Sequence, residues 1–92
     1  MATKAQRHLI ALNIKAGRIE LATRTAVLAN LEQGYSGHLR GFFIGNAECD
    51  FEEAGGTRHQ FAAGLAAMTK KGQYQQSDDP DYRGKFGYFV NE

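Results

Sequence analysis

The sequence predicts a single small α+β domain, residues 1–92, in which two helices pack on an antiparallel sheet of about four to five strands. Three observations lead to this prediction. A chain of 92 residues is long enough for one hydrophobic core only. The apolar residues follow a helical period in two segments, near residues 23–33 and 57–71. In several shorter segments they alternate with polar or small residues, as in strands.

The first 21 residues fit two local structures. Thr3 and Gln6 have the spacing of a capping box, which favours a helix over residues 4–16. The apolar residues at positions 10, 12 and 14 favour a strand instead, because they would share one side of a strand but not of a helix. We favour a hairpin with its turn at residues 15–18 and keep the helix as the alternative. From Thr23 onward the pattern is helical, with Gly34 placed to end that helix.

The centre of the chain predicts a second hairpin. Residues 38–44 and 47–53 flank Gly45-Asn46, a pair typical of a tight two-residue turn. The second arm alternates between apolar and acidic residues. Its apolar side holds Ala47, Cys49 and Phe51, and its acidic side holds Glu48, Asp50 and Glu52. We therefore expect Cys49 to be buried in the core and the three carboxylates to face water or a partner.

The second half of the chain supplies one more helix and the last strand. Thr57 and Gln60 form a second capping box, which begins a helix that runs to about Lys71. The polar residues 75–81 predict an exposed loop. Residues 85–90 predict a strand that is apolar on both faces.

Composition and charge exclude several classes of protein. With 42% hydrophobic and 23% charged residues, the chain has the composition of a globular domain. No apolar run approaches the roughly 20 residues that cross a bilayer, and the start of the chain lacks the pattern of a signal peptide. We therefore expect a soluble cytoplasmic protein without a membrane partner. The formal net charge of +1 favours neither a polyanion mimic nor a general nucleic-acid binder.

The net charge hides an uneven distribution along the chain. Residues 1–45 carry six lysines and arginines against two glutamates, whereas residues 46–56 carry four carboxylates and no base. The acidic residues would complement the lysines and arginines that line a nucleic-acid-binding channel in a partner protein. Near the C-terminus, Tyr82 and Arg83 precede the predicted aromatic strand, which begins at Lys85. Many proteins bind single-stranded RNA by stacking its bases on aromatic residues of a sheet that also carries basic residues.

The residues that could support catalysis or bind a metal do not form a known arrangement. Cys49 and the three histidines lack the paired close spacings of structural zinc sites. The turn Gly55-Gly56 lacks the lysine of a phosphate-binding loop. Neighbouring carboxylates in a strand point to opposite faces, so Glu52 and Glu53 would not converge on one ion. We expect a protein without enzymatic activity, small-molecule substrate, metal or other cofactor.

Along its length the chain resembles phage-encoded anti-CRISPR proteins directed at type I-F surveillance complexes. The residues that carry the resemblance are Met1-Ala2-Thr3-Lys4-Ala5-Gln6-Arg7, Ala47-Glu48-Cys49-Asp50-Phe51 and Tyr82-Arg83-Gly84-Lys85-Phe86. The resemblance implies a non-enzymatic inhibitor in the cytoplasm of a bacterial host, which binds Cas proteins, with guide RNA as a further contact, and blocks target DNA. The near-neutral net charge differs from that of the acidic DNA mimics in this group and favours a surface of mixed charge.

Two functions from different classes follow from these observations. As such an inhibitor, the protein is expected to contact its partner through Arg40, Glu48, Asp50, Glu52, Tyr82, Arg83 and Lys85. The alternative is a small nucleic-acid-binding regulatory protein that uses the basic N-terminal half and the aromatic C-terminal strand. Salt dependence separates the two, because binding to a phosphate backbone weakens steeply as salt rises.

Overall fold

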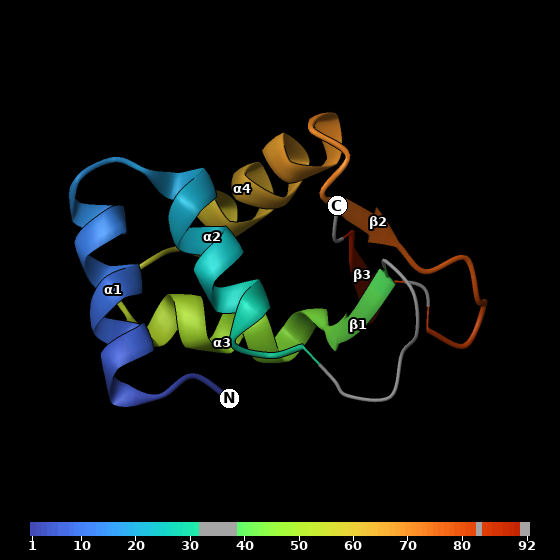
Figure 1. The fold of residues 1–92 in the computed structure, drawn as a ribbon, viewed down its shortest axis with the longest axis horizontal. Helices are drawn as coiled ribbons and strands as arrows, with labels where there is room; N and C mark the ends of the chain where they lie inside the picture. The colour runs from blue at the N-terminus through green and yellow to red at the C-terminus, as the bar shows by residue number, and fades with distance from the viewer. Residues whose placement is uncertain (32–38, 83, 91–92) are drawn as a thin grey trace.

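The computed structural model of this protein describes residues 1–31, 39–82 and 84–90. Within these residues, four helices pack together in one half of the molecule, and a three-stranded antiparallel sheet forms the other half (Figure 1). The helices are α1 (Lys4–Lys15), α2 (Ile19–Leu28), α3 (Ile44–Glu53) and α4 (Arg58–Lys70). The strands are β1 (Leu39–Phe43), β2 (Tyr74–Gln76) and β3 (Phe86–Val90). The α+β class is confirmed, but the described residues hold more helices and fewer strands than predicted.

The N-terminal segment is helical, which corrects the predicted hairpin. Thr3 caps α1, because its side chain accepts a hydrogen bond from the N–H of Gln6 and its own N–H donates to the Gln6 side chain. The apolar pattern misled because Ile10 is buried in the core whereas Leu9 and Leu12 stay about half exposed. The capping box therefore predicts the structure of this segment correctly, whereas the apolar periodicity does not.

The second helix begins earlier than predicted. α2 starts at Ile19, directly after a turn in which Gly17 has a φ of 78°, a left-handed conformation that glycine adopts readily. It ends at Leu28. Residues 29–31 are not helical, so the predicted continuation of this helix to Gly34 is wrong.

Residues 44–53 form the helix α3 and not the second arm of a hairpin. The predicted turn residues lie in its first turn. The alternation that predicted a strand also fits a helix, because Ala47 and Phe51 are four residues apart and share the buried side of α3. Two expectations that depended on the strand are wrong. Asp50, expected to be exposed, is buried, and Cys49, expected to be buried, is exposed.

Three predictions for the rest of the chain are confirmed. The capping box of Thr57 and Gln60 begins α4, and the predicted strands 38–44 and 85–90 correspond to β1 and β3. The sheet order is β1-β3-β2, so the aromatic strand β3 is central. The segment predicted as a loop, residues 75–81, begins inside the short edge strand β2.

The core lies between the helices and the inner face of the sheet. Its large apolar side chains with the lowest exposure are Ile10, Val27, Phe42, Phe51, Phe61 and Met68. Phe51 of α3 and Phe61 of α4 meet edge to face, with ring centroids 5.5 Å apart. At the packing contact of α2 and α4, a Cβ on Gly64 would overlap the side chain of Thr23. Glycine therefore permits the close approach of these two helices.

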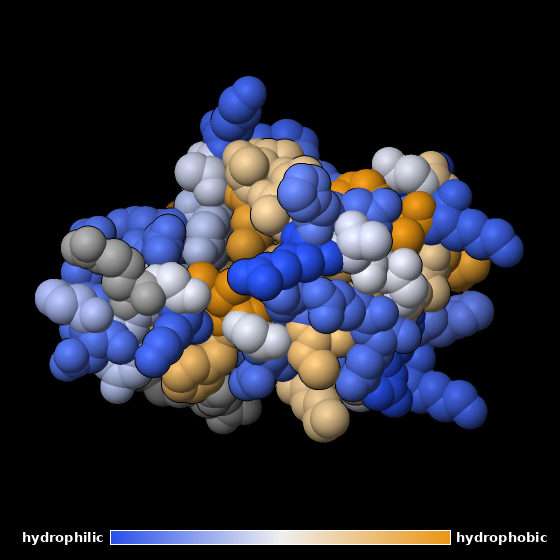
Figure 2. Space-filling view, turned by 180° about the vertical axis from the view of Figure 1, so that it is seen from behind, coloured by the Kyte–Doolittle hydropathy of each residue, from blue (hydrophilic) through white to orange (hydrophobic). Residues whose placement is uncertain are grey.

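The surface is mostly polar, with separate apolar patches, as the view from behind shows in orange (Figure 2). Large apolar side chains that are at least 40% exposed include Leu9, Leu12, Leu28 and Phe43. No helix within the described ranges has the length and apolar character needed to cross a bilayer.

Candidate partner-binding face

The sheet presents different aromatic residues on its two faces. Phe42 and Phe89 point toward the helices, because both are buried in the core and Arg24 of α2 lies over the Phe89 ring, 5.6 Å from its centroid. Side chains alternate along a strand, so Phe43 of β1 and Phe86 of β3 point to the opposite face. These two residues are cross-strand partners. The outer face of the sheet therefore begins with a pair of phenylalanines.

Four rings form a connected cluster on this outer side. Phe86 contacts Phe43 at a centroid distance of 5.0 Å, Tyr88 at 5.4 Å and Tyr82 at 6.0 Å. We call these four residues the aromatic face. The Phe43 and Tyr88 contacts are edge-to-face, the arrangement that aromatic pairs favour. Phe86 is only 6% exposed, whereas Phe43 is 40% and Tyr82 is 47% exposed. One buried ring thus supports two rings that are open to solvent.

Backbone hydrogen bonds hold Tyr82 in place before β3. Its N–H donates to the carbonyl of Asp79 at 3.0 Å. Its carbonyl accepts from the N–H groups of Lys85, at 2.9 Å, and Phe86, at 3.0 Å. Gly84, which lies between Tyr82 and Lys85 in the sequence, has a φ of 77°, a conformation that other residues rarely adopt. Hydrogen bonds on both sides of its peptide groups therefore fix the backbone of Tyr82.

Carboxylates lie along the loop that leads to Tyr82. Asp78, Asp79 and Asp81 are exposed, and the loop is ordered by side-chain contacts. The N–H of Asp79 donates to the hydroxyl of the buried Ser77 at 3.2 Å, and the N–H of Asp81 donates to the Asp79 carboxylate at 3.0 Å. Exposed rings beside carboxylates suit a cationic ligand group, because arginine stacks on aromatic rings and pairs with carboxylates.

The structure brings together only part of the predicted partner-binding set. Tyr82, a member of the aromatic face, and Lys85 lie in the same turn. Arg83 lies outside the described residues. Arg40 of β1 is the cross-strand partner of Phe89 of β3, so its side chain points to the helix side of the sheet, away from the aromatic face. The exposed ring of Phe43 was not among the predicted contacts, because only the tertiary structure shows which strand residues face outward.

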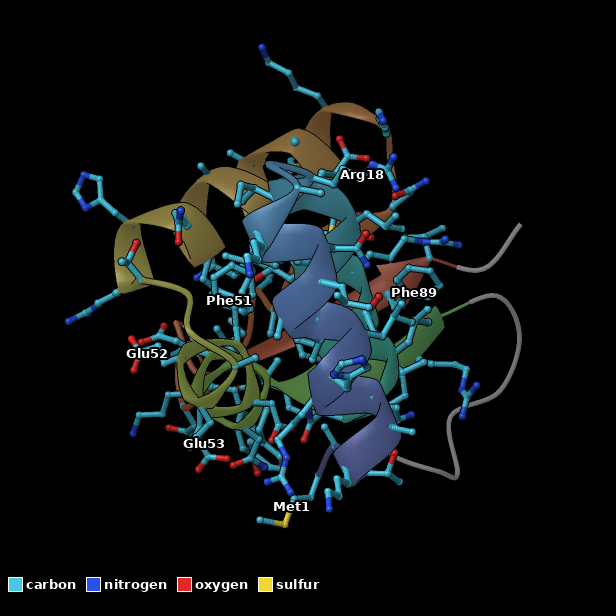
Figure 3. The ribbon with its side chains drawn as sticks, turned by 90° about the vertical axis from the view of Figure 1, so that its left-hand side faces the viewer. Met1, Arg18, Phe51, Glu52, Glu53 and Phe89 are labelled. Atoms are coloured by element: carbon cyan, nitrogen blue, oxygen red, sulfur yellow. The ribbon has the colours of Figure 1, made fainter. Side chains whose placement is uncertain are left out.

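The predicted acidic face does not exist as a row of three carboxylates. Glu48 and Glu52 are four residues apart on α3 and share one side of the helix, whereas Asp50 lies on the other. Glu52 is exposed and points away from the core (Figure 3). The carboxylate of Glu48 lies 3.9 Å from Nε of the exposed Arg58, at the limit of an ion pair. The helix therefore leaves two acidic residues for a surface role.

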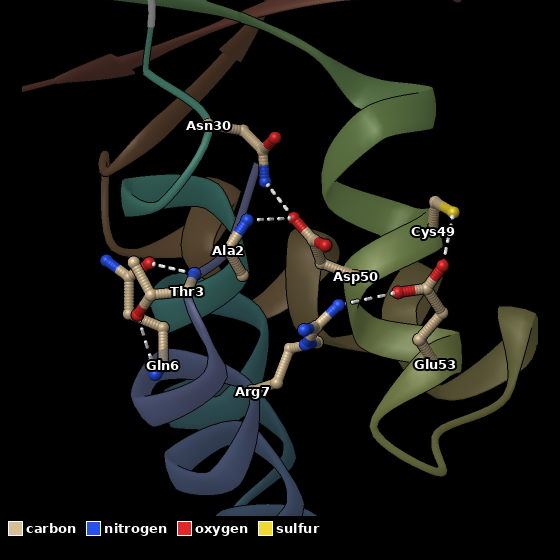
Figure 4. Close-up of polar contacts among 8 residues, drawn as sticks. All are labelled: Ala2, Thr3, Gln6, Arg7, Asn30, Cys49, Asp50 and Glu53. Carbon is tan, nitrogen blue, oxygen red and sulfur yellow. Dashed lines mark hydrogen bonds and ion pairs between the residues drawn. The ribbon is translucent and has the colours of Figure 1, made fainter.

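Asp50 has a structural position. It is 3% exposed, and its Oδ2 accepts hydrogen bonds from the N–H of Ala2 at 2.9 Å and from Nδ2 of Asn30 at 2.7 Å (Figure 4). Nδ2 of Asn30 also donates to the carbonyl of Ala26. Asp50 thus connects the start of the chain and the end of α2 to α3. This role replaces the predicted contact with a partner.

Cys49 lies on the surface beside Glu53. Its thiol donates to Oε1 of Glu53 at 3.5 Å, and Oε2 of the same carboxylate lies 3.3 Å from Nη1 of Arg7 (Figure 4). The hydrogen bond to Glu53 and the negative charge of that carboxylate raise the pKa of the Cys49 thiol. A raised pKa keeps the sulfur protonated, which weakens it as a nucleophile. Among the residues with described positions, no three His, Cys, Asp or Glu side chains gather as metal ligands would.

Comparisons with known protein families, curated proteins and solved structures find no match for this chain. A function must therefore be inferred from its own residues. Of the features described above, the aromatic face and its neighbouring carboxylates offer the chemistry best suited to binding a macromolecule.

Proposed function

We propose that this protein is a non-enzymatic inhibitor that binds a Cas subunit of a type I-F surveillance complex through its aromatic face and prevents target DNA from binding. The observation that carries the proposal is the pair of exposed rings, Phe43 and Tyr82, supported by the buried ring of Phe86. The choice of partner rests on the resemblance of the sequence to phage anti-CRISPR proteins. The choice of a protein surface rests on the chemistry of the face.

The aromatic face has the properties of a protein-binding anchor. Large aromatic side chains dominate the binding energy of protein interfaces when they enter pockets of the partner. Phe86 holds the two exposed rings in place, so that less side-chain freedom is lost when they bind. Tyr82 also has a hydroxyl group that can form a hydrogen bond at the edge of such a pocket. These features favour a tight contact over a small area.

The charges near Tyr82 indicate which kind of partner surface would bind the aromatic face. Residues 78–85 hold three aspartates, Asp78, Asp79 and Asp81, against two bases, Arg83 and Lys85. This excess of carboxylates complements arginines and lysines, which line the paths along which Cas subunits hold nucleic acid. An arginine on the partner could stack on Tyr82 and pair with an aspartate of the loop. With extents of 33 × 26 × 23 Å, a domain seated on such residues would exclude DNA sterically.

A second candidate function is the binding of single-stranded nucleic acid, since exposed rings on a sheet can stack on bases. Two observations make it less favoured. The loop aspartates would repel phosphates close to Tyr82. The basic helix α1 and the sheet lie at opposite ends of the molecule, so one short oligonucleotide would not contact both (Figure 1).

A capture experiment tests the proposal. The tagged protein is mixed with purified type I-F surveillance complex, with and without bound target DNA, and target binding is then measured. We expect capture of the DNA-free complex, loss of target binding, and failure of both in the variants Phe43→Ser and Tyr82→Ser. Leu28→Ser is the matched control, because Leu28 is 41% exposed and lies outside the aromatic face.

Three results would contradict the proposal. The first is the absence of capture by the DNA-free complex. The second is capture that the Phe43→Ser and Tyr82→Ser variants leave unchanged. The third is binding to free RNA that weakens steeply with salt in the absence of any capture, which would support the second candidate function instead.

A further inference from the structure

The outer side of α1 forms a second surface, distinct from the aromatic face. Six exposed residues lie on this side of the helix: Lys4, Ala5, His8, Leu9, Leu12 and Lys15. We call them the α1 outer face. Their spacing of mostly three or four residues places them within one half of the helix circumference. The opposite half packs on the protein and includes the buried Ile10 and Asn13.

One side of the α1 outer face is apolar. Leu9 and Leu12, one turn apart, are 49% and 51% exposed, and Ala5 lies on the turn before Leu9. In the view of Figure 3, α1 lies at the front of the molecule, and no other described helix or strand lies over it. Leucines that extend past a small alanine form a ridge that can pack into a groove of another helix.

The other side of the α1 outer face is basic. α1 contains no acidic residue, and no ion pair of the described residues involves Lys4 or Lys15. By contrast Arg7, on another side of the same helix, pairs with Glu53 at 3.3 Å. The described residues therefore neutralise the cation that lies beside α3 and supply no ion-pair partner for the two lysines of the outer face.

We propose that the α1 outer face binds an amphipathic helix of a partner protein, in which apolar side chains are flanked by aspartates and glutamates. The two leucines would pack against the apolar side chains, and Lys4 and Lys15 would pair with the acids. This interaction does not depend on the function proposed above, because the aromatic face lies at the other end of the molecule (Figure 1).

Other occupants fit these residues less well. A second copy of the chain, packed face to face, would bring Lys4 and Lys15 close to the same lysines of the other copy, and these like charges would repel each other. A nucleic-acid backbone would leave Leu9 and Leu12 without apolar contacts. A lipid surface would match both leucines and cations, but no tryptophan or tyrosine, the usual residues of a membrane interface, is among the six.

The test uses synthetic helical peptides with leucines at three- and four-residue spacing. One panel of several registers carries glutamates beside the leucines, and a matched panel carries lysines. Titration of the full chain should show binding of a glutamate peptide at least about tenfold tighter than of its lysine counterpart. The double variant Leu9→Ser/Leu12→Ser should weaken this binding by about tenfold or more.

Charge reversal makes the test independent of any loss of folding. The double variant Lys4→Glu/Lys15→Glu should invert the preference and bind the lysine peptides, whereas the control Lys70→Glu, on the exposed end of α4, should not. The proposal is wrong if no glutamate peptide binds below a Kd of about 1 mM, or if neither double variant changes binding. It is also wrong if the surface binds only phosphatidylglycerol vesicles, or if sedimentation shows a dimer that Leu9→Ser/Leu12→Ser dissociates.

Discussion

Replacing Asp50 by alanine should destabilise the fold by at least about 3 kcal/mol. This carboxylate is 3% exposed and accepts hydrogen bonds from Ala2 at 2.9 Å and from Asn30 at 2.7 Å. Hydrogen bonds to charged groups contribute about 1.5–3 kcal/mol each. In the variant, Asn30 keeps its hydrogen bond to the carbonyl of Ala26, so the free energy lost at Asn30 lies at the low end of this range. The buried N–H of Ala2 loses the Asp50 carboxylate, its hydrogen-bond acceptor. At about 1.5 kcal/mol for each bond, the low end of the range, the two losses sum to about 3 kcal/mol as the smallest expected effect.

The effect is large for a domain of this size, whose total stability is about 5–14 kcal/mol. It should lower Tm by about 12–24 °C, at 4–8 °C for each kcal/mol. Urea and thermal unfolding followed by far-UV circular dichroism would measure it. Asp50→Asn should lie between the wild type and Asp50→Ala, because the amide keeps one acceptor oxygen. The control Glu52→Ala removes an exposed carboxylate of the same helix and should change stability by less than about 0.5 kcal/mol. An Asp50→Ala variant as stable as this control would refute the structural role of Asp50.

Two further predictions follow from single residues. Gly64→Ala should destabilise the fold by about 1–3 kcal/mol, because the added Cβ would overlap the side chain of Thr23. The control Gly45→Ala should not destabilise it, because the space around Gly45 is open. Equal melting temperatures for the two variants would contradict this packing. Because the Glu53 hydrogen bond and charge raise the pKa of Cys49, less thiolate is present at a given pH, and iodoacetamide should alkylate Cys49 more slowly than an unstructured cysteine peptide. Glu53→Gln should lower that pKa and speed alkylation, and an unchanged rate in this variant would show that the carboxylate has no such effect.

Local signals in the sequence predicted the helix starts better than apolar periodicity did. The capping boxes at Thr3 and Thr57 both form, because two reciprocal hydrogen bonds fix the first turn whatever the later residues bury. Periodicity failed at α1 because Leu9 and Leu12 are exposed, so the apolar residues do not mark the core side. A rule that apolar residues lie inside cannot foresee a helix that leaves leucines on its outer side.

The acidic segment shows a second limit of sequence reasoning. Alternation over residues 47–53 fits a strand, but Ala47 and Phe51 also satisfy a helix, and the pattern alone does not separate the two. The choice of a strand placed Cys49 in the core and Asp50 on the surface, whereas in the structure Cys49 is exposed and Asp50 is buried. Nothing in the local sequence marks Asp50 as buried, because its hydrogen-bond partners come from residues 20 and 48 positions away.

The candidate site was predictable in part. The sequence placed Tyr82 and Lys85 beside an aromatic strand, and the structure finds them in one turn at the start of β3. It did not identify Phe43, whose exposure depends on the register of β1 with β3. Arg40 was included because of its charge, but strand alternation directs it to the other side of the sheet. Residue type thus predicted the chemistry of the face, and only the sheet register defined its members.

The most direct test of the proposed function is a titration of DNA-free type I-F surveillance complex with the wild-type protein and with Tyr82→Ser. Tyr82 is 47% exposed and stands at the open edge of the aromatic face, so its loss should leave the fold intact. If the face is the contact, Kd should rise by about 10- to 30-fold, as for an interface anchor worth about 1.4–2 kcal/mol. A Kd within about threefold of the wild-type value, or no binding by the wild type, would contradict the account.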